Sequence, residues 1–376
     1  MFIEEIFELD SLLDYEKQVS TTKEVNITNI SYWNASSEYQ EYMLKHIKFD
    51  YIPNIFNYKY TYDIPLDIRN QIIKKLTGYS DRKIMGLLTS SSSCSIVNMI
   101  NFLKLNGFKK LCILTPAYFS VEQSCKIFNL SFEKKALIFH NGQYHIPVEY
   151  ILKNHFNAVW LTSPIYSTGK VYDETQVHAI QELINHQILV IADETLAMYG
   201  QELARKLPIS NYFYSIYSPH KPLFINSIKF SAILCPKHND DFLEQWIDVL
   251  GGALLHSNIT AIMHFLSPNY QLCFQSSMAW YRKSMSSIDT ILKQFPFAYY
   301  DMEDIGAYKT IYFKTNTYDP DNLEAIKNLI DTKYVSYIPG SYNGFKDNTY
   351  HCFRVNLTYN PQEIKNTLYR ILTYYT

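Results

Sequence analysis

Four groups of side chains that could do chemistry each stand directly after a short apolar run in this 376-residue sequence. They are the amine of Lys221, the carboxylate of Asp193, the ring of Tyr118 and the hydroxyls of the serine run 90–93. An amine can attack a carbonyl carbon, a carboxylate can hold a positive charge, and the start of a helix can bind an anion. This chemistry requires that the apolar runs bring the four groups to one place.

The apolar runs are typical of buried strands, and helical patterns separate them. We predict strands over 84–89, 110–114, 158–162, 188–192, 212–217 and 230–234, and helices over 92–105, 121–128 and 173–185. Ile188–Ala192 is entirely apolar, as expected of a strand that is covered on both faces. The alternation predicts an α/β fold with a mostly parallel, seven-stranded-type sheet and helices on both faces. Ligands of such a sheet bind beyond the carboxyl ends of the strands, where all four groups would lie.

The last hundred residues follow a different pattern. We predict strands over 308–313, 335–338 and 352–357, and helices over 321–330 and 361–372. This order is typical of a compact α+β unit, and helical patterns between residues 242 and 292 would connect it to the sheet. We therefore expect a large domain over residues 51–275 and a smaller α+β domain formed by the segments 1–50 and 276–376.

Composition argues against several other classes of protein. Lys plus Arg is 34 and Asp plus Glu is 36, without a basic block, so we expect no nucleic-acid partner. No stretch approaches 18 uninterrupted apolar residues and the start lacks a signal-peptide pattern, so we expect no membrane association and a cytoplasmic location. The six cysteines form no CxxC pair, and we expect no metal site. Only 11 glycines are present, too few for a turn-rich β protein.

One cofactor, pyridoxal 5'-phosphate, suits this set of groups. Lys221 would form a Schiff base with its aldehyde, and Asp193 would keep its pyridine nitrogen protonated, so that the ring can accept electrons. Tyr118 would stack on the ring, and Ser92 and Ser93 would contact the phosphate at the start of a helix. Each residue also has a simpler alternative: a surface lysine, a helix cap, a core tyrosine or solvated serines.

The same residues, in the same order, resemble the class I/II aminotransferases of the fold-type I pyridoxal-phosphate enzymes. The resemblance extends from about Ile30 to Leu357. Ser163–Gly169 is similar to the family's Asn-Pro-x-Asn-Pro-Thr-Gly loop, and Ser218–Lys221 is similar to its Ser-x-x-Lys frame. Pro339–Ser341 and the later Phe353–Val355 resemble its Pro-Gly-Ser turn and the segment with the arginine that binds the substrate carboxylate.

The resemblance implies an aspartate-aminotransferase-like fold and a site assembled in a homodimer with shared active sites. Its cofactor-binding residues would be Ser92, Ser93, Tyr118, Tyr166, Asp193, Ser218, Lys221 and Lys229. Arg354 would bind the substrate carboxylate. Asn34, Tyr58 and Tyr60 lie near family segments that reach a pocket, and structural roles are the alternative for these three. The implied reaction is transamination between an amino acid and a keto acid, with Lys221 as the catalytic residue.

Three positions depart from the family pattern. Tyr166 replaces the second asparagine of the loop, Leu196 replaces a tyrosine, and Lys229 replaces a phosphate-binding arginine. Tyr166 would supply the hydrogen bond to the cofactor's 3-oxygen, whereas Lys229 keeps the charge of arginine but not its two-pronged grip. These changes leave open a pyridoxal-phosphate-dependent lyase, cyclase or oxidase of an amino acid on the same fold. A binding protein without activity is a third reading, which the retained lysine, aspartate and arginine disfavour.

Glycine is scarce where the family commonly has it. Ser91, Ser227 and Ser231 stand at such positions, whereas Gly169 and Gly340 are kept. This pattern predicts a stiffer backbone around the phosphate and phosphate contacts that use serine hydroxyls.

Overall fold

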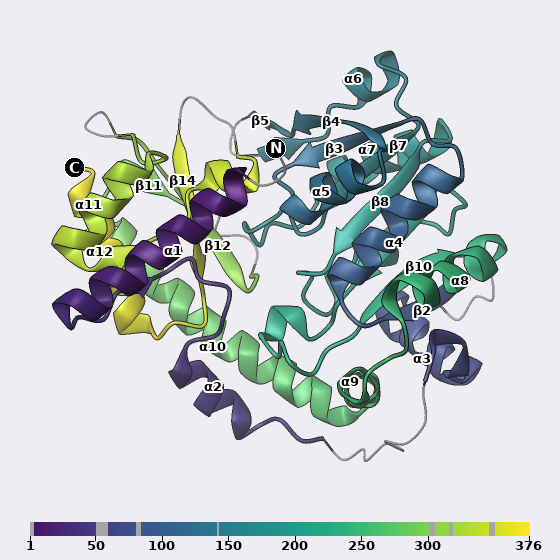
Figure 1. Ribbon diagram of the computed structural model, residues 1–376, viewed down its shortest axis with the longest axis horizontal. Helices are drawn as coiled ribbons and strands as arrows, with labels where there is room; N and C mark the ends of the chain where they lie inside the picture. Colours follow the sequence, from purple (N-terminus) through teal and green to yellow (C-terminus); the bar gives the residue numbers. More distant parts are fainter. Residues whose placement is uncertain are drawn as a thin grey trace. The chain divides into compact units, whose positions relative to one another are not determined.

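The computed structural model describes residues 4–49, 59–79, 84–140, 143–300, 305–315, 319–345 and 350–376 (Figure 1). The chain forms two compact units. Unit 1 comprises Met1–Lys45, Ser167–Gly169 and Ser276–Thr376, and unit 2 comprises His46–Tyr166 and Lys170–Gln275.

Unit 2 is built on a seven-stranded sheet in the order β2-β10-β9-β8-β7-β3-β4. Its strands are β2 (Ile84–Thr89), β3 (Lys110–Thr115), β4 (Ser131–Ala136), β7 (Ala158–Thr162), β8 (Leu189–Glu194), β9 (Phe213–Tyr217) and β10 (Ser231–Pro236). β10 runs antiparallel to β2 and β9, and the other pairings of this sheet are parallel. The predicted mostly parallel sheet is therefore confirmed. A short hairpin of β5 (Ile138–His140) and β6 (Gln143–His145) follows β4.

The helices of unit 2 include several that carry a capping signal at one end. They are α3 (Leu66–Thr77), α4 (Ser92–Leu105), α5 (Phe119–Ile127), α6 (Val148–Lys153), α7 (Glu174–Asn185), α8 (Asp240–Gly251) and α9 (His256–Leu266), and α10 (Pro268–Leu292) continues into unit 1. At the start of α7, the side chain of Asp173 accepts a hydrogen bond from the backbone N–H of Gln176. The side chain of Gln176 in turn accepts one from the backbone N–H of Asp173. α4 ends at Asn106, and Gly107 follows with a φ of 75°.

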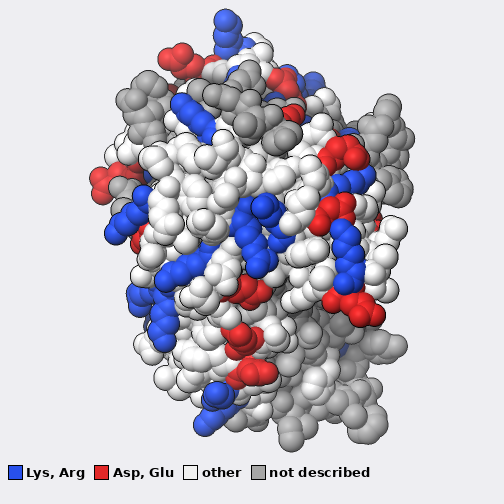
Figure 2. Space-filling model, turned by 90° about the vertical axis from the view of Figure 1, so that its left-hand side faces the viewer, with Lys and Arg blue, Asp and Glu red and all other residues white. Residues whose placement is uncertain are grey.

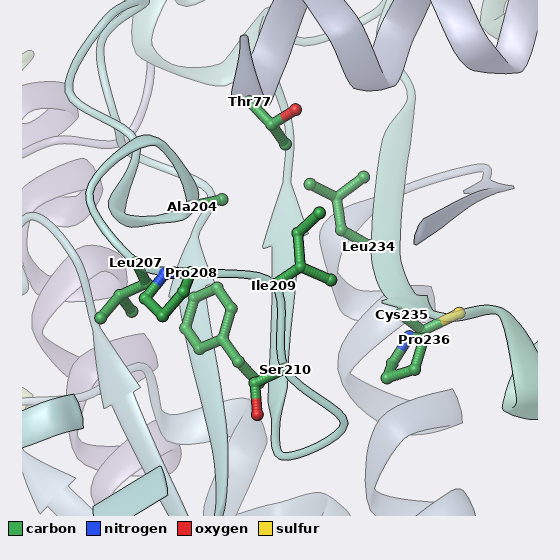
Figure 3. A pocket seen from close by; sticks show the side chains of 10 residues that line it. Thr77, Ala204, Leu207, Pro208, Ile209, Ser210, Leu234, Cys235 and Pro236 are labelled. Carbon is green, nitrogen blue, oxygen red and sulfur yellow. The ribbon is translucent and has the colours of Figure 1, made fainter. Parts of the chain in front are cut away.

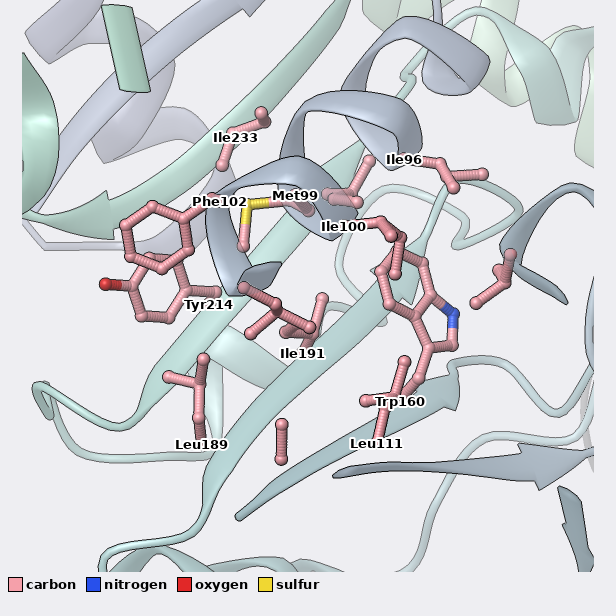
Figure 4. Packing of buried hydrophobic residues seen from close by; sticks show 14 of the residues in the cluster. Ile96, Met99, Ile100, Phe102, Leu111, Trp160, Leu189, Ile191, Tyr214 and Ile233 are labelled. Carbon is pink, nitrogen blue, oxygen red and sulfur yellow. The ribbon is translucent and has the colours of Figure 1, made fainter. Parts of the chain in front are cut away.

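A hydrophobic core fills the space between α4 and one face of the sheet (Figure 4). Ile96, Met99 and Ile100 of α4 have helical spacing and pack against strand residues such as Trp160 and Ile191. Side chains alternate along a strand, so Asp193, two places after Ile191, points to the same face of the sheet as Ile191. The next residue, Glu194, points to the opposite face. Asp193 and Glu194 are the last two residues of β8.

Unit 1 is an α+β structure, as predicted for the last hundred residues. Its elements are α1 (Glu4–Lys23), β1 (Thr28–Asn29), α2 (Ser37–Leu44), β11 (Ala298–Tyr299), β12 (Tyr308–Phe313), α11 (Leu323–Lys333), β13 (Val335–Ser336), β14 (His351–Asn356) and α12 (Pro361–Tyr374). The strands form one sheet in the order β11-β12-β14 and a parallel pair of β1 and β13.

The two retained glycines are required by close backbone contacts within unit 1. A Cβ atom at Gly340 would lie 2.9 Å from the carbonyl oxygen of Cys352. Gly169 has a φ of 74°, and a Cβ atom there would lie 3.0 Å from the carbonyl oxygen of Tyr308. Any side chain at either position would force the backbone apart.

Charged side chains of both signs occur on the face shown in Figure 2, beside broad areas that carry neither. This is expected of a chain with a net charge of −2. Among the described helices, none is long and apolar enough to cross a membrane.

Candidate active site

The carboxylate of Asp193 lies at the carboxyl end of β8, where its side chain is only 1% exposed. Oδ1 accepts a hydrogen bond from the backbone N–H of Thr195 at 3.1 Å. Burial raises the pKa of this carboxyl, whereas the positive charge of Lys221 and the hydrogen bonds of Thr195 act in the opposite direction. A buried carboxylate needs such a positive partner, because its charge is otherwise costly to remove from water.

Lys221 follows β9 and begins a short 3-10 turn, η3 (Lys221–Leu223). Its backbone N–H donates to the carbonyl oxygen of Ser218 at 3.0 Å. The Nζ atom lies 5.1 Å from the ring centre of Tyr118, and that ring centre lies 6.2 Å from the ring centre of the buried Tyr166. Unit 2 thus brings together the amine, the buried carboxylate and the two rings that the sequence singled out.

The serine run stands at the start of α4, as predicted. Ser91 is the N-cap, and its Oγ accepts from the backbone N–H of Cys94 at 3.2 Å. Ser92 is buried and Ser93 is exposed. The first N–H groups of a 14-residue helix therefore lie next to two serine hydroxyls, which is an arrangement that suits an anion.

Asn258 was not singled out from the sequence, yet it connects two segments of the candidate site. Its side chain is 3% exposed, and Nδ2 donates to the carbonyl oxygens of Ser90 at 3.0 Å and Lys229 at 2.7 Å. Its Oδ1 accepts from the backbone N–H of Leu255 at 2.7 Å. The half-buried Lys229 is thereby held beside the start of α4. The only local signal was a polar residue in the first turn of a helix, and its two partners are far away in sequence.

Two other serines have their hydroxyl groups bonded inside the protein. Ser218 Oγ donates to the carbonyl oxygen of Phe230 at 3.0 Å. Ser231 Oγ donates to the carbonyl oxygen of Tyr217 at 2.6 Å and accepts from Ser95 Oγ at 2.9 Å. These contacts join the ends of β9 and β10 to α4. The expectation that serine hydroxyls replace glycine as phosphate contacts therefore receives no support at position 231, where the hydroxyl stabilises the sheet edge.

The residues predicted to bind the substrate lie in unit 1. Arg354 is 1% exposed in β14, and its Nε donates to the carbonyl oxygen of Ser31 at 2.9 Å. Its Cζ atom lies 3.2 Å from the ring centre of Trp33 and 5.1 Å from that of Tyr308. Asn34 has an exposed side chain.

The backbone carbonyl oxygen of Asn34 accepts from Asn356 Nδ2 at 2.8 Å. Tyr60 belongs to unit 2, where its ring stacks on Tyr62 with 5.4 Å between the ring centres. Tyr58 lies outside the described residues.

Glu194 is a second buried acid on the same strand, on the opposite face from Asp193. It accepts hydrogen bonds from the backbone N–H of Leu203 and from Ser215 Oγ. Burial raises the pKa of its carboxyl to about 8. Glu194 therefore carries a proton near neutral pH, and it holds β8 to the turn η2 (Leu203–Arg205).

The raised pKa of Glu194 predicts that stability falls as the pH rises from 4.5 to about 8. The ordinary value is 4.5, so between that pH and about 8 the folded state keeps a proton that the unfolded state releases. The contribution is complete below pH 4.5 and is lost as the pH rises through about 8. Glu194→Gln cannot ionise, so the change in the free energy of unfolding between pH 5 and pH 8.5 should be smaller in this variant by on the order of a few kcal/mol. Urea unfolding of both proteins at pH 5, 7 and 8.5 measures the effect, and parallel curves would contradict it.

One pocket of unit 2 lies away from these residues (Figure 3). It is lined by Thr77, Ala204, Leu207, Pro208, Ile209, Ser210, Phe213, Leu234, Cys235 and Pro236. Phe213 begins β9 and Pro236 ends the antiparallel β10. The pocket therefore lies at the amino end of β9, whereas Lys221 follows the carboxyl end of that strand. Its lining is mostly apolar and offers neither an amine nor a carboxylate.

A group of possible metal ligands occurs in unit 1. Ligand atoms of Asp319, Asp321 and His351 lie within 4.8 Å of one another. His351 Nδ1 is 3.4 Å from Asp321 Oδ2, which is the distance of an ordinary ion pair at a partly exposed surface. We assign no metal to this group.

The donor set at the end of β8 and β9 fits pyridoxal phosphate. A partly exposed lysine amine lies over an aromatic ring, and the charge of that lysine acts on a fully buried carboxylate. A cationic pyridine ring would meet the need of the Asp193 carboxylate for a positive partner. The start of α4 offers N–H groups for a phosphate.

Comparisons with known proteins give a partial family match and a shared fold. Residues 38–208 match the family model described as aminotransferase class I and II. No curated protein matches the sequence. Among solved structures, the multiple substrate aminotransferase of Thermococcus profundus has a TM-score of 0.77 at 14% identity, over 100% of this chain and 97% of that chain.

Two further solved structures are similar over nearly the whole chain. A double mutant of Thermus thermophilus aspartate aminotransferase has a TM-score of 0.76 at 14% identity, over 97% of this chain and 95% of that chain. A pyridoxal-phosphate-bound C-S lyase from Staphylococcus hominis has a TM-score of 0.67 at 17% identity, over 98% and 85%. The chain therefore has the fold of aspartate aminotransferase, and its residues 38–208 match the model of the class I and II aminotransferases.

Proposed function

We propose that this protein is a pyridoxal-phosphate-dependent aminotransferase that uses Lys221 to convert an amino acid to a keto acid. The observation that carries the proposal is the convergence of Lys221, Asp193 and Tyr118 at the carboxyl ends of parallel strands, next to the start of α4. The family match of residues 38–208 supports the same class of reaction.

Each residue has a distinct task in this proposal. Ser92, Ser93 and Lys229 would hold the phosphate, with Ser218 nearby in the lysine turn, and Tyr118 would lie against the ring. When bound, pyridoxal phosphate supplies an aldehyde for a lysine amine and a ring that accepts electrons.

The catalytic tasks fall to three side chains. The carboxylate of Asp193 would hold a proton at the ring nitrogen. Once displaced by the substrate amine, Lys221 Nζ would accept the proton from the substrate Cα. Arg354 would bind the substrate carboxylate and so fix the direction of the Cα–H bond, with Asn34 beside it.

A lyase, cyclase or oxidase reaction on the same fold is the second candidate. Leu196 is buried at a position where the family has a tyrosine, so a phenol is absent from that position. The similarity in fold to a C-S lyase supports this second candidate.

A screen of amino acids tests the proposal and separates the two candidates. Purified protein is loaded with pyridoxal phosphate and incubated with each amino acid, with and without a keto acid, and the products are identified by mass. Transamination is expected to give a keto acid and a new amino acid only when the acceptor is present. Release of ammonia without an acceptor would instead favour the second candidate. No product with any amino acid would overturn both.

Tyr166 would donate a hydrogen bond to the cofactor's 3-oxygen. Tyr166→Phe removes this donor, and we expect the pH midpoint of the visible absorption of the loaded protein to rise by about one unit, because a hydrogen bond to a charged group is lost. Tyr118→Phe keeps the ring beside Lys221 and is the matched control. An unchanged absorption band and titration in Tyr166→Phe would contradict the role.

We infer further that the protein acts in the cytoplasm as a homodimer with shared active sites. All six cysteines are thiols in the structure, which suits a reducing compartment. Dimerisation is supported by the family resemblance. Size-exclusion chromatography with light scattering tests it, and a monomer at micromolar concentration would contradict it.

A further inference from the structure

The segment that carries Lys221 is anchored at successive residues. Ser218 and Lys221 make the hydrogen bonds described above, and the hydroxyl of Tyr270 in α10 donates to the carbonyl oxygen of Pro219 at 2.9 Å. The remaining residue is His220, whose side chain is 0% exposed. Its carbonyl oxygen accepts from two backbone N–H groups of the following turn, both at 3.2 Å. A displacement of His220 would therefore move the whole lysine turn.

The ring of His220 begins a chain of hydrogen bonds that ends at a thiol. His220 Nε2 lies 3.0 Å from Nδ1 of His264 in α9, and His264 Nε2 lies 3.8 Å from Cys273 Sγ in α10. Cys273 donates its proton to the carbonyl oxygen of His46 at 3.2 Å. Its sulfur therefore accepts from His264 Nε2–H, which makes Nδ1 of His264 the acceptor for His220 Nε2–H. In this arrangement His220 is the Nε2–H tautomer.

The surroundings of His220 favour the neutral ring. Phe230 and Tyr270 lie edge-on, with ring centres 5.9 Å and 5.6 Å away. Burial lowers the pKa of His220 well below its usual value, and electrostatic interactions with His264 and Lys75 act in the same direction. The bare Nδ1 of His220 has no hydrogen-bond partner among the described residues. The contact with His264 is therefore the side-chain hydrogen bond of the His220 ring among the described residues.

We propose that the neutral His220–His264 pair, oriented by Cys273, positions the amine of Lys221. The inference rests on the proposed function, because positioning matters only if Lys221 reacts. His220 and His264 are positioning residues, since they act through the backbone of the lysine turn. When a reacting amine is already held in one place, the reaction loses less entropy on the way to the transition state. Small displacements of such an amine therefore slow the reaction strongly.

Two variants of His264 separate the hydrogen bond from the packing of the ring. His264→Asn keeps an acceptor for His220 Nε2–H but loses the ring. His264→Phe keeps a ring of similar size between Phe49 and Tyr270 but offers no acceptor. Pyridoxal phosphate is added to each protein, the adduct is reduced with borohydride at timed intervals, and label on the Lys221 peptide is measured by mass spectrometry. We expect labelling in the Phe variant to be at least about tenfold slower and labelling in the Asn variant to be close to wild type.

The tautomer is tested in the protein without cofactor. Nitrogen-15 NMR of histidine-labelled protein should show one neutral ring with protonated Nε2 and bare Nδ1, which disappears in His220→Gln. Cys273→Ala removes the sulfur that accepts from His264 Nε2–H, so both neutral tautomers of His264 should become populated. This variant replaces the His264 variants in the test if those have lowered melting temperatures. A charged His220 ring, an Nδ1–H tautomer, or labelling in the Phe variant as fast as in the Asn variant would overturn the inference alone. No label on Lys221 in the wild-type protein would overturn the proposed function, and this inference with it.

Discussion

Lys221→Arg is expected to lower turnover by at least about 10⁴-fold while the protein stays folded. Arginine keeps the positive charge that acts on the buried Asp193 carboxylate. Its guanidinium group stays protonated at all accessible pH values, so it can neither form a Schiff base nor accept a proton. Steady-state kinetics with the best amino acid of the screen measures the loss, and borohydride trapping should give no label at position 221. A variant that keeps more than about a hundredth of the wild-type turnover would refute the assignment.

Lys221→Met is the companion variant, because it removes the charge as well as the amine. The carboxylate of Asp193 then loses its positive neighbour, and the pKa of Asp193 should rise further. Comparison of melting temperatures for the Arg and Met variants isolates the electrostatic part of the contribution of Lys221 to stability. Equal melting temperatures at pH 6 and pH 8 would mean that the two groups do not interact.

Asp193→Asn should lower turnover by about 10²- to 10³-fold with little loss of stability. The amide oxygen can still accept from the N–H of Thr195, so the local structure is kept. The negative charge that would hold a proton at the cofactor ring is lost, and with it the ability of the ring to accept electrons. The melting temperature should stay constant or rise, because a buried charge has been removed.

The adjacent Glu194 supplies a matched control for this variant. Glu194→Gln makes the same chemical change one residue further along β8, on the opposite face of the sheet. We expect it to change the pH dependence of stability and to leave turnover within about threefold of wild type, because substitutions away from the reacting groups have small effects. A loss of turnover as large as that of Asp193→Asn would show that damage to the strand, and not the missing charge, explains both results.

The elements of this protein could be predicted where the sequence carries local signals. Capping residues and apolar spacing located α4 at Ser92–Leu105, and an apolar run located β7 at Ala158–Thr162. β4 (Ser131–Ala136) was missed because it is an edge strand with a polar, largely exposed sequence. A pattern of apolar residues cannot reveal a strand that buries little.

The candidate site was predictable in its order along the chain but not in its contacts. Lys221 and Tyr118 follow strands and Asp193 lies at the carboxyl end of one, so a parallel sheet brings them together beyond the carboxyl ends of its strands. Ser231 stands at a position where the family commonly has glycine, and its hydroxyl donates to the carbonyl oxygen of Tyr217 on the neighbouring strand. The partners of Asn258 lie in segments that are distant in sequence. Such contacts depend on tertiary packing, which one sequence does not show.

Helix α9 holds both ends of the candidate cofactor site. Asn258 fixes the segments beside the start of α4, and His264 fixes the ring that precedes Lys221. The two residues are six positions apart on one helix, so they are about 9 Å apart along its axis. A one-residue insertion or deletion between them would turn one relative to the other by about 100°. The number of residues between Asn258 and His264 is therefore fixed by the two contacts that they make, although neither residue touches the substrate in the proposed reaction.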